Sequence, residues 1–262
     1  MTLAASNTST RLLGAPSIPT VIFAGILALV LVWLALNPAL AGLLVTWLPY
    51  LGQGFAMNVL IAVCAMGLGT LAGVLLGAME LSSFAPVRLL AVSYVQVFRN
   101  APHLVLIFAT TYIFPFEIVV FGTYIPFPDW LKAVVGLAIP ASAHIAEITR
   151  GAIQSIATTQ WEASKGVGFS YSQTLRWIIL PQCVRRSLPA WMNLCASITM
   201  GTALASLVGV HELLHSANDA STAVRRTDFT ILVYLTVLMG FFAFCYPISR
   251  FTQRLERRFA DR

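Results

Sequence analysis

Charged side chains are scarce in this sequence. Asp, Glu, Lys and Arg make up 10% of its 262 residues, whereas an ordinary soluble domain contains about 25%. Hydrophobic residues reach 58%, and the mean hydropathy is +0.82. This composition excludes a soluble globular protein and indicates an integral membrane protein.

Patterns that would indicate chemistry are missing as well. There is no phosphate-binding loop of the G-x-x-x-x-G-K-[ST] kind, so the sequence predicts no ATP site in this chain. The segment 144–147, His-Ile-Ala-Glu, falls short of the metalloprotease pattern H-E-x-x-H, and His144 is interpreted as a packed helix residue. We therefore expect a chain that is not an enzyme, with no bound cofactor and no metal site.

Cysteine is also infrequent. The four cysteines lie in or beside hydrophobic segments without metal-ligand spacing: Cys64, Cys183, Cys195 and Cys245. Cysteines in such surroundings serve as small apolar packing residues, so no disulfide framework is expected.

Long apolar runs dominate the chain. A helix needs about 20 apolar residues to cross a bilayer. Six stretches approach this length: roughly 18–36, 54–79, 102–121, 131–149, 188–209 and 229–249. They do not alternate as the strands of a membrane barrel would. The prediction is an all-α, multi-pass membrane protein of about six transmembrane helices.

The first of these runs precedes Ala39-Leu40-Ala41, which is similar to a signal-peptidase site. A signal-peptide core has 7–15 residues, and this run has about 19. We expect a retained first helix, with cleavage as the alternative.

The basic residues predict the orientation. With the N-terminus in the cytoplasm, the external segments hold only Lys132, Arg225 and Arg226 of the 16 basic residues. The cytoplasmic side holds the others: Arg11, Arg88, Arg99, Arg150, Lys165, Arg176, Arg185, Arg186, Arg250, Arg254, Arg257, Arg258 and Arg262. This distribution follows the positive-inside rule and places both termini in the cytoplasm. A basic tail of this kind anchors topology beside anionic lipid, so no nucleic-acid partner is expected.

Two further features concern packing and the external surface. Gly69, Gly73 and Gly77 repeat every fourth residue, a spacing that lets two membrane helices approach closely. The external segment 210–228 carries His211, Glu212, His215 and Asp219 among its polar residues. It is either a landing surface for an external partner or an ordinary solvated loop.

The segment 155–185 is a polar island between apolar segments. Residues 159–162 and 170–173 both have the form of a capping box, which opens a helix. Gly166 or Gly168 can end the first helix, and Pro181 is expected to stop the second. The prediction is a rigid knob of two short helices joined by a glycine hinge.

Three apolar residues of this segment, Trp161, Val167 and Phe169, stand among polar neighbours. Large apolar side chains in such a setting are typical of interface anchors. We expect them to anchor the knob in a partner protein.

The spacing within this segment is similar to that of a known family. Glu162-Ala163-Ser164-x-x-x-Gly168, then nine residues, then Ile178-x-Leu180-Pro181 resembles the loop by which membrane subunits of bacterial ABC importers dock onto their ATPase. The family usually has Ala at the position of Ser164.

Other segments extend the resemblance over most of the chain after about residue 53. Residues 98–102 and 147–153 are similar to segments of permeases for polar amino acids. Residues 81–87 and 94–99 look most like those of glutamate/aspartate importers. Because the family has a five-helix core, the resemblance implies an added first helix. It divides the chain into residues 1–52 (tail, extra helix and external loop) and a transporter domain, 53–262.

The resemblance also implies partners in a bacterial inner membrane. These are an ATPase dimer that binds ATP and Mg²⁺, a second permease that is identical or homologous, and an external solute-binding protein that delivers an amino acid. The residues expected to couple to the ATPase are Trp161, Glu162, Ala163, Ser164, Gly168, Phe169, Leu180 and Pro181.

Residues 198–206 depart from the family's usual K-x-T/S-S-L-A-S, because the commonly charged position before the Thr/Ser is lost. Thr199, Thr202 and Ser206 lie on one face of the expected helix, where they either line a substrate path or bond carbonyls of their own helix. The lost charge suggests that a partner permease holds the substrate site.

A stand-alone secondary transporter or channel is the rival hypothesis. Such proteins often contain paired internal repeats, and the 150–187 pattern occurs once in this sequence.

Overall fold

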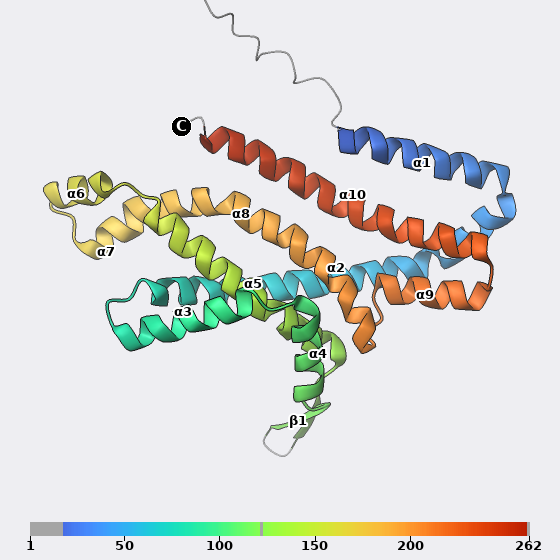
Figure 1. The fold of residues 1–262 in the computed structure, drawn as a ribbon, viewed down its shortest axis with the longest axis horizontal. Coiled ribbons are helices and arrows are strands. Elements are labelled where there is room, and N and C mark those ends of the chain that lie inside the picture. The colour runs from blue at the N-terminus through green and yellow to red at the C-terminus, as the bar shows by residue number, and fades with distance from the viewer. Residues whose placement is uncertain (1–17, 121–122, 261–262) are drawn as a thin grey trace, which may run out of the picture.

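The computed structural model describes residues 18–120 and 123–260, which are almost entirely helical (Figure 1). The helices are α1 (Ile18–Leu36), α2 (Pro38–Glu80), α3 (Ala85–Arg99), α4 (His103–Ile113), α5 (Asp129–Gln154), α6 (Thr158–Gly166), α7 (Tyr171–Thr174), α8 (Leu180–Gly201), α9 (Leu213–Val224) and α10 (Thr227–Ala260). A π-helical turn, η1 (Leu175–Ile179), precedes α8, and a 3₁₀ segment, η2 (Thr202–Val208), follows it. Two strands, β1 (Glu117–Val120) and β2 (Thr123–Pro126), pair antiparallel. Arg11 and Arg262 lie outside the described residues.

Within the described residues, five helical segments are long and apolar enough to cross a membrane. They are Pro19–Leu36, Pro38–Glu80, Asp129–Gln154, Tyr171–Val208 and Thr227–Glu256. This confirms the all-α membrane fold.

The expected span at 102–121 is wrong, because α4 covers only 11 residues. A helix of that length rises about 16 Å, roughly half of the hydrocarbon core. Phe114 ends α4 in an extended conformation, as expected for a residue that precedes proline. The chain then enters the β1–β2 hairpin, in which Glu117 faces Pro126.

The expected external loop ending at residue 52 is also wrong. Residues 38–80 form one continuous helix of 43 residues, with Pro38 in its first turn, where a proline needs no N–H partner. The boundary expected at 52/53 therefore falls inside α2. At about 65 Å, this helix is twice as long as a bilayer core is thick.

α1 is attached to the outside of the bundle. Phe23 of α1 stacks on Phe242 of α10 with ring centroids 4.2 Å apart, and the hydroxyls of Thr20 and Tyr246 lie 2.9 Å apart. Of the residues Pro19–Leu36 in α1, only 6% are buried. α1 is thus a mostly exposed helix at the edge of the bundle, with Val30 buried against the core that includes α9 and α10.

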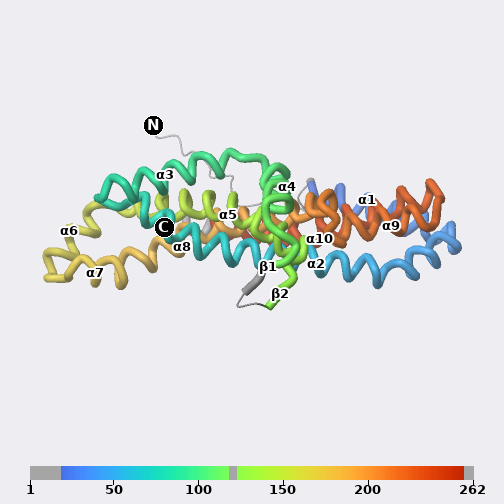
Figure 2. Tube along the Cα trace, turned by 90° about the horizontal axis from the view of Figure 1, so that it is seen from below, coloured from blue at the N-terminus to red at the C-terminus, as the bar shows by residue number. Residues whose placement is uncertain are grey.

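Two apolar cores share α2 as their common wall. One joins α2 to α4, α5 and α8 through residues such as Ile61, Ile107 and Leu137. The other joins the first half of α2 to α9 and α10 through residues such as Leu51 and Phe229. The result is an elongated molecule, with α6 and α7 at one end and α9 at the other (Figure 2).

The most extensive helix contact runs between α2 and α5. Gly69, Gly73 and Gly77 face α5 so closely that a Cβ built on any of them would lie 2.6–2.8 Å from the nearest α5 atom. At Gly73 that atom is Cβ of Ile145. Because lipid supplies no hydrophobic force between helices, this backbone approach is where van der Waals packing can hold them together.

Replacing Gly73 by Ala tests this contact, because the added methyl has no room against Ile145. We expect Gly73→Ala to lower the free energy of unfolding by about 1–3 kcal/mol, as overpacking does in other cores. The matched control is Gly67→Ala on the same helix, where a Cβ meets nothing within 4 Å. Thermal denaturation in detergent compares the two, and equal melting temperatures would contradict the packing role.

Candidate functional site

The segment from Thr158 to Ile179, here called the knob, projects from the end of the molecule opposite α9 (Figure 1). It comprises α6, α7 and η1, and it connects α5 to α8. Its stems are joined at the base: Nη1 of Arg186 in α8 donates to the carbonyl of Ser155 at 2.6 Å and to its hydroxyl at 3.0 Å. The knob is therefore fixed to two membrane helices.

The hinge of the knob is Gly168. Its φ is +84°, a left-handed conformation that glycine adopts without steric cost. The N–H of Phe169 donates to the carbonyl of Ser164 at 3.0 Å, and the N–H of Gly168 donates to the carbonyl of Lys165 at 3.0 Å. These two bonds form a Schellman motif, which ends α6 and reverses the chain.

Only one of the two capping boxes predicted from the sequence forms. At 170–173 the box is present: the backbone N–H of Ser170 donates to the Gln173 side chain at 2.8 Å, and the Ser170 hydroxyl accepts from the Gln173 N–H. The box expected at 159–162 is wrong. α6 already begins at Thr158, whereas an N-cap residue must be non-helical.

Pro181 does not stop the second helix, contrary to expectation. The π-helical turn η1 precedes it, and the helix continues as α8 with Pro181 in its first turn. A proline leaves one helical hydrogen bond unmade, and the regular α-helical pattern is interrupted by η1 directly before it. Single π-turns of this kind are common at functional sites.

Trp161 lies inside the knob instead of projecting from it as an anchor. Its ring stacks on the ring of Tyr171 with centroids 5.6 Å apart, and it packs against a small apolar core that includes Ile156 and Ile179. It therefore holds α6 against the adjoining helices.

Other apolar side chains form the outer surface of the knob. Val167 is 72% exposed, Trp177 is 68% exposed and Phe169 is 40% exposed. These three residues, called the apolar knob surface below, include two of the anchors predicted from the sequence. Large apolar side chains that are exposed in a short polar segment are candidates for contact with a partner.

The remaining motif residues have distinct positions. Ser164 is buried, and its hydroxyl donates to the carbonyl of Gln160 at 2.6 Å. A serine can therefore replace the family's usual alanine, because its extra oxygen bonds within α6. Glu162, Ala163, Leu180 and Pro181 are exposed.

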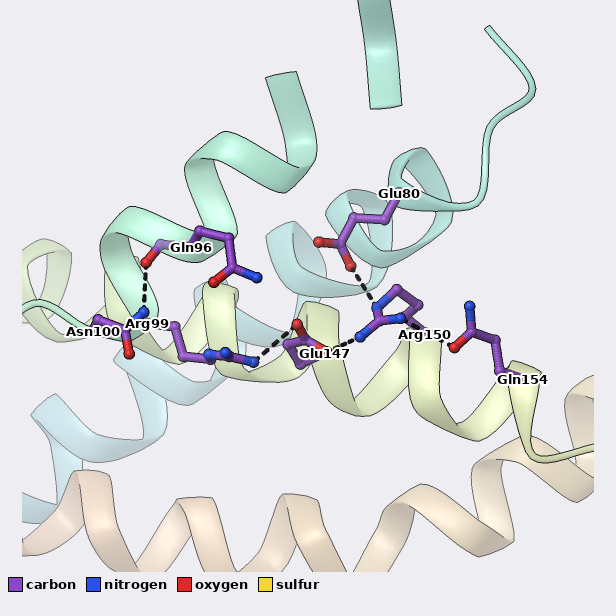
Figure 3. Close-up of polar contacts among 7 residues, drawn as sticks. All are labelled: Glu80, Gln96, Arg99, Asn100, Glu147, Arg150 and Gln154. Carbon is purple, nitrogen blue, oxygen red and sulfur yellow. Dashed lines mark hydrogen bonds and ion pairs between the residues drawn. The ribbon is translucent and has the colours of Figure 1, made fainter. Parts of the chain in front are cut away.

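An ionic cluster ties three helices together where α5 leads toward the knob (Figure 3). Glu147 of α5 pairs with Arg99 of α3 at 2.9 Å and with Arg150, one turn along α5. Arg150 also lies 3.4 Å from Glu80 at the end of α2, and the Glu80 side chain is almost fully buried. The segments 98–102 and 147–153, singled out separately in the sequence, thus meet in space.

The three hydroxyls of the proposed substrate path bond within their own helix. Thr199 donates to Cys195, Thr202 to Thr199 and Ser206 to Ala203, at 2.7–2.8 Å. Of the two alternatives for these hydroxyls, the bonds to carbonyls of their own helix are thus present.

Thr199 also borders a groove of about 340 Å³. Val59, Met66, Trp191 and Phe244 line the same groove, which is therefore mainly apolar.

Sequence reasoning missed a buried polar network where the middle of α2 meets the starts of η2 and α9. The Asn58 side-chain amide donates to Thr202 at 2.9 Å and to Glu212 at 2.7 Å, and its oxygen accepts from the N–H of Leu213 at 2.9 Å. Burial raises the pKa of the Glu212 carboxyl, and the hydrogen bond from Asn58 opposes this rise. A lone asparagine in an apolar run was the only signal in the sequence.

Comparison with known proteins agrees with this architecture. Residues 69–261 match the family described as "Binding-protein-dependent transport system inner membrane component". A probable amino-acid ABC transporter permease of Bacillus subtilis, YckA, is 34% identical over 81% of this chain and 90% of its own length. The glutamate/aspartate import permease GltK of Escherichia coli O157:H7 is 33% identical over 81% of this chain and 95% of its own.

Solved structures show the same fold. A chain of an amino acid ABC transporter crystallised with histidines superposes with a TM-score of 0.70 and 27% identity, covering 82% of this chain and 96% of that chain. A chain of the MetNI methionine ABC transporter superposes with a TM-score of 0.59 at 19% identity, covering 79% and 96%.

The knob, the apolar helices and the family match over residues 69–261 lead to one conclusion. This chain belongs to the inner-membrane components of binding-protein-dependent transport systems, and it is the multi-pass permease subunit of an ABC importer.

Proposed function

We propose that this permease carries polar amino acids into a bacterial cell, with glutamate and aspartate as the first substrates to test. The observation that supports this class is the similarity over about four-fifths of the chain to permeases named for amino-acid, L-cystine and glutamate/aspartate transport. External capture of the amino acid falls to a separate solute-binding protein, and a second permease, identical or homologous, completes the path. The rival of a stand-alone secondary transporter is not favoured by the family.

The knob is proposed to dock in a cleft of the partner ATPase, which binds ATP and Mg²⁺. The apolar knob surface supports this, because it offers large side chains to a partner on a short, braced segment. The knob and both chain termini then face the cytoplasm, in keeping with the positive-inside distribution of basic residues, provided that α3 and α4 together return the chain across the membrane between α2 and α5. Arg225 and Arg226, counted as external, lie at the α9–α10 junction, at the end of the molecule away from the knob.

Force applied to the knob would pass directly into the bundle. The stems are joined by Arg186 and Ser155, so α5 and α8 move together at the base of the knob. α5 is bound in turn to α3 and α2 through Glu147 and Arg150. Closure of the ATPase dimer would therefore tilt several helices as a unit and open the path to the other side, as in other rocking transitions.

Uptake measurements test the substrate class. In proteoliposomes holding the permease, its ATPase and its binding protein, we expect ATP-dependent accumulation of radiolabelled glutamate or another polar amino acid. Excess unlabelled polar amino acid should abolish this signal, while a sugar should leave it unchanged. Accumulation of a substrate that is not an amino acid would contradict the proposed class and leave the coupling role of the knob standing.

A substitution at the hinge tests coupling separately. Gly168→Val forces a β-branched residue into a left-handed conformation, which costs at least about 1–2 kcal/mol. We expect it to reduce permease-dependent ATP hydrolysis at least about tenfold by disordering the turn that presents Phe169. The matched control is Gly166→Val, because Gly166 is equally exposed and lies in the last turn of α6 without a left-handed φ.

In both positions a Cβ meets nothing within 4 Å, so the two variants differ in backbone conformation and not in space. ATP hydrolysis by the reconstituted complex is the measurement. Hydrolysis in Gly168→Val equal to that in Gly166→Val would contradict a coupling role for the hinge.

A further inference from the structure

Two histidines and an aspartate converge at the end of the molecule opposite the knob. His211 directly precedes the N-cap of α9, and His215 and Asp219 follow at intervals of four residues on one face of that helix. One potential ligand atom from each residue lies within 4.8 Å of those of the other two. Nε2 of His215 is 3.8 Å from Oδ2 of Asp219, and the two imidazole rings have centroids 4.3 Å apart. The transport mechanism described above uses none of these side chains.

The surroundings hold these groups in place. The Tyr50 hydroxyl of α2 donates to Oδ2 of Asp219 at 2.8 Å, which orients the carboxylate. The backbone N–H of His215 donates to Oε1 of Glu212 at 2.8 Å. Glu212 is fully buried and is bonded by Asn58 of α2. Hydrogen bonds that orient ligands from behind are a regular part of protein metal sites.

We propose that His211, His215 and Asp219 bind one divalent transition-metal ion of the Zn²⁺ class, with water in the fourth position. Two imidazole nitrogens and one carboxylate oxygen form a ligand set that suits Zn²⁺, Ni²⁺ or Cu²⁺. Ca²⁺ and Mg²⁺ are disfavoured, because they require oxygen ligands throughout.

The fit requires only side-chain movement. Ligands about 2.0–2.2 Å from a tetrahedral zinc lie roughly 3.4 Å from one another, and the His215–Asp219 pair is at 3.8 Å. The ring of His211 is exposed and can turn to close the third side. The bound ion would join the turn before α9 to α9 itself and, through Tyr50, to α2.

The chain contains four histidines, so His144 provides a matched control. It lies in the middle of α5, a different helix from the one that carries His215 and Asp219. Zn²⁺ alone is titrated by calorimetry into the purified permease–ATPase complex, which carries a tag without histidine. Co²⁺ in a parallel sample reports tetrahedral nitrogen and oxygen ligation by its visible absorption.

We expect wild type and His144→Gln to bind one Zn²⁺ per permease chain at this site. His215→Gln and Asp219→Asn should each raise the dissociation constant for Zn²⁺ at least tenfold and abolish the visible absorption of bound tetrahedral Co²⁺. Tyr50→Phe should weaken Zn²⁺ binding about 10-fold or more while leaving the ligands in place. Zinc should also raise the melting temperature of wild type and not that of His215→Gln.

Two results would overturn the proposal. One is a wild-type complex that takes up no Zn²⁺ at concentrations up to about 100 µM, which is far above the dissociation constant expected of a three-ligand site. The other is Zn²⁺ binding of unchanged stoichiometry and affinity in the double variant His211→Gln, His215→Gln. Because all variants are compared without metal for melting temperature and elution volume, loss of binding through misfolding is recognised directly.

Discussion

The rest of this structure depends on the close approach of α2 and α5. Gly69, Gly73 and Gly77 leave no Cβ at three successive turns of α2, so the backbone of α5 lies directly against it there. In a membrane, where apolar surface alone does not drive helices together, such an approach allows dense van der Waals packing. Because α2 is also a wall of both apolar cores, fixing α5 to it fixes α5 to the whole bundle.

From this contact a continuous set of interactions leads to the knob. α5 carries Glu147 and Arg150, whose ion pairs bind α3 and the end of α2, and only three residues separate its end at Gln154 from the knob. Arg186 of α8 donates to the carbonyl of Ser155 at the end of α5, so the two helices are joined at the base of the knob. The knob itself is stiffened by the Schellman motif at Gly168, the capping box at Ser170 and the stacked Trp161. A segment built in this way is suited to transmit displacement without absorbing it.

Features that depend on local composition could be predicted from the sequence. The apolar runs, the packing glycines and the short helices of the knob follow from residue type at fixed spacing. The span at 102–121 was wrong because hydropathy ignored the break at Phe114-Pro115, and 38–52 was interpreted as a loop although Pro49 is accommodated within α2. These errors concern helix limits, which hydropathy marks poorly.

What depends on distant contacts could not be predicted. The partners Asn58 and Glu212 are 154 residues apart, and Arg99 and Glu147 come from separate motifs. The inward position of Trp161 depends on Tyr171, in the helix after the hinge. His211, His215 and Asp219 were named only as polar residues of an external segment, and their convergence follows from the helix α9, in what was taken for a loop.

Site-directed cross-linking tests the central claim most directly, which is that the knob is the ATPase-binding element. The four native cysteines are first replaced, and single cysteines are placed at exposed Val167 in the knob or at exposed Thr222 on α9. A maleimide–benzophenone reagent is attached to that cysteine in the assembled transporter, and on illumination it inserts into neighbouring C–H bonds, so it should join the ATPase to the permease from position 167 and not from position 222. Capture of the ATPase from position 222, or from neither position in a complex that hydrolyses ATP, would contradict the account.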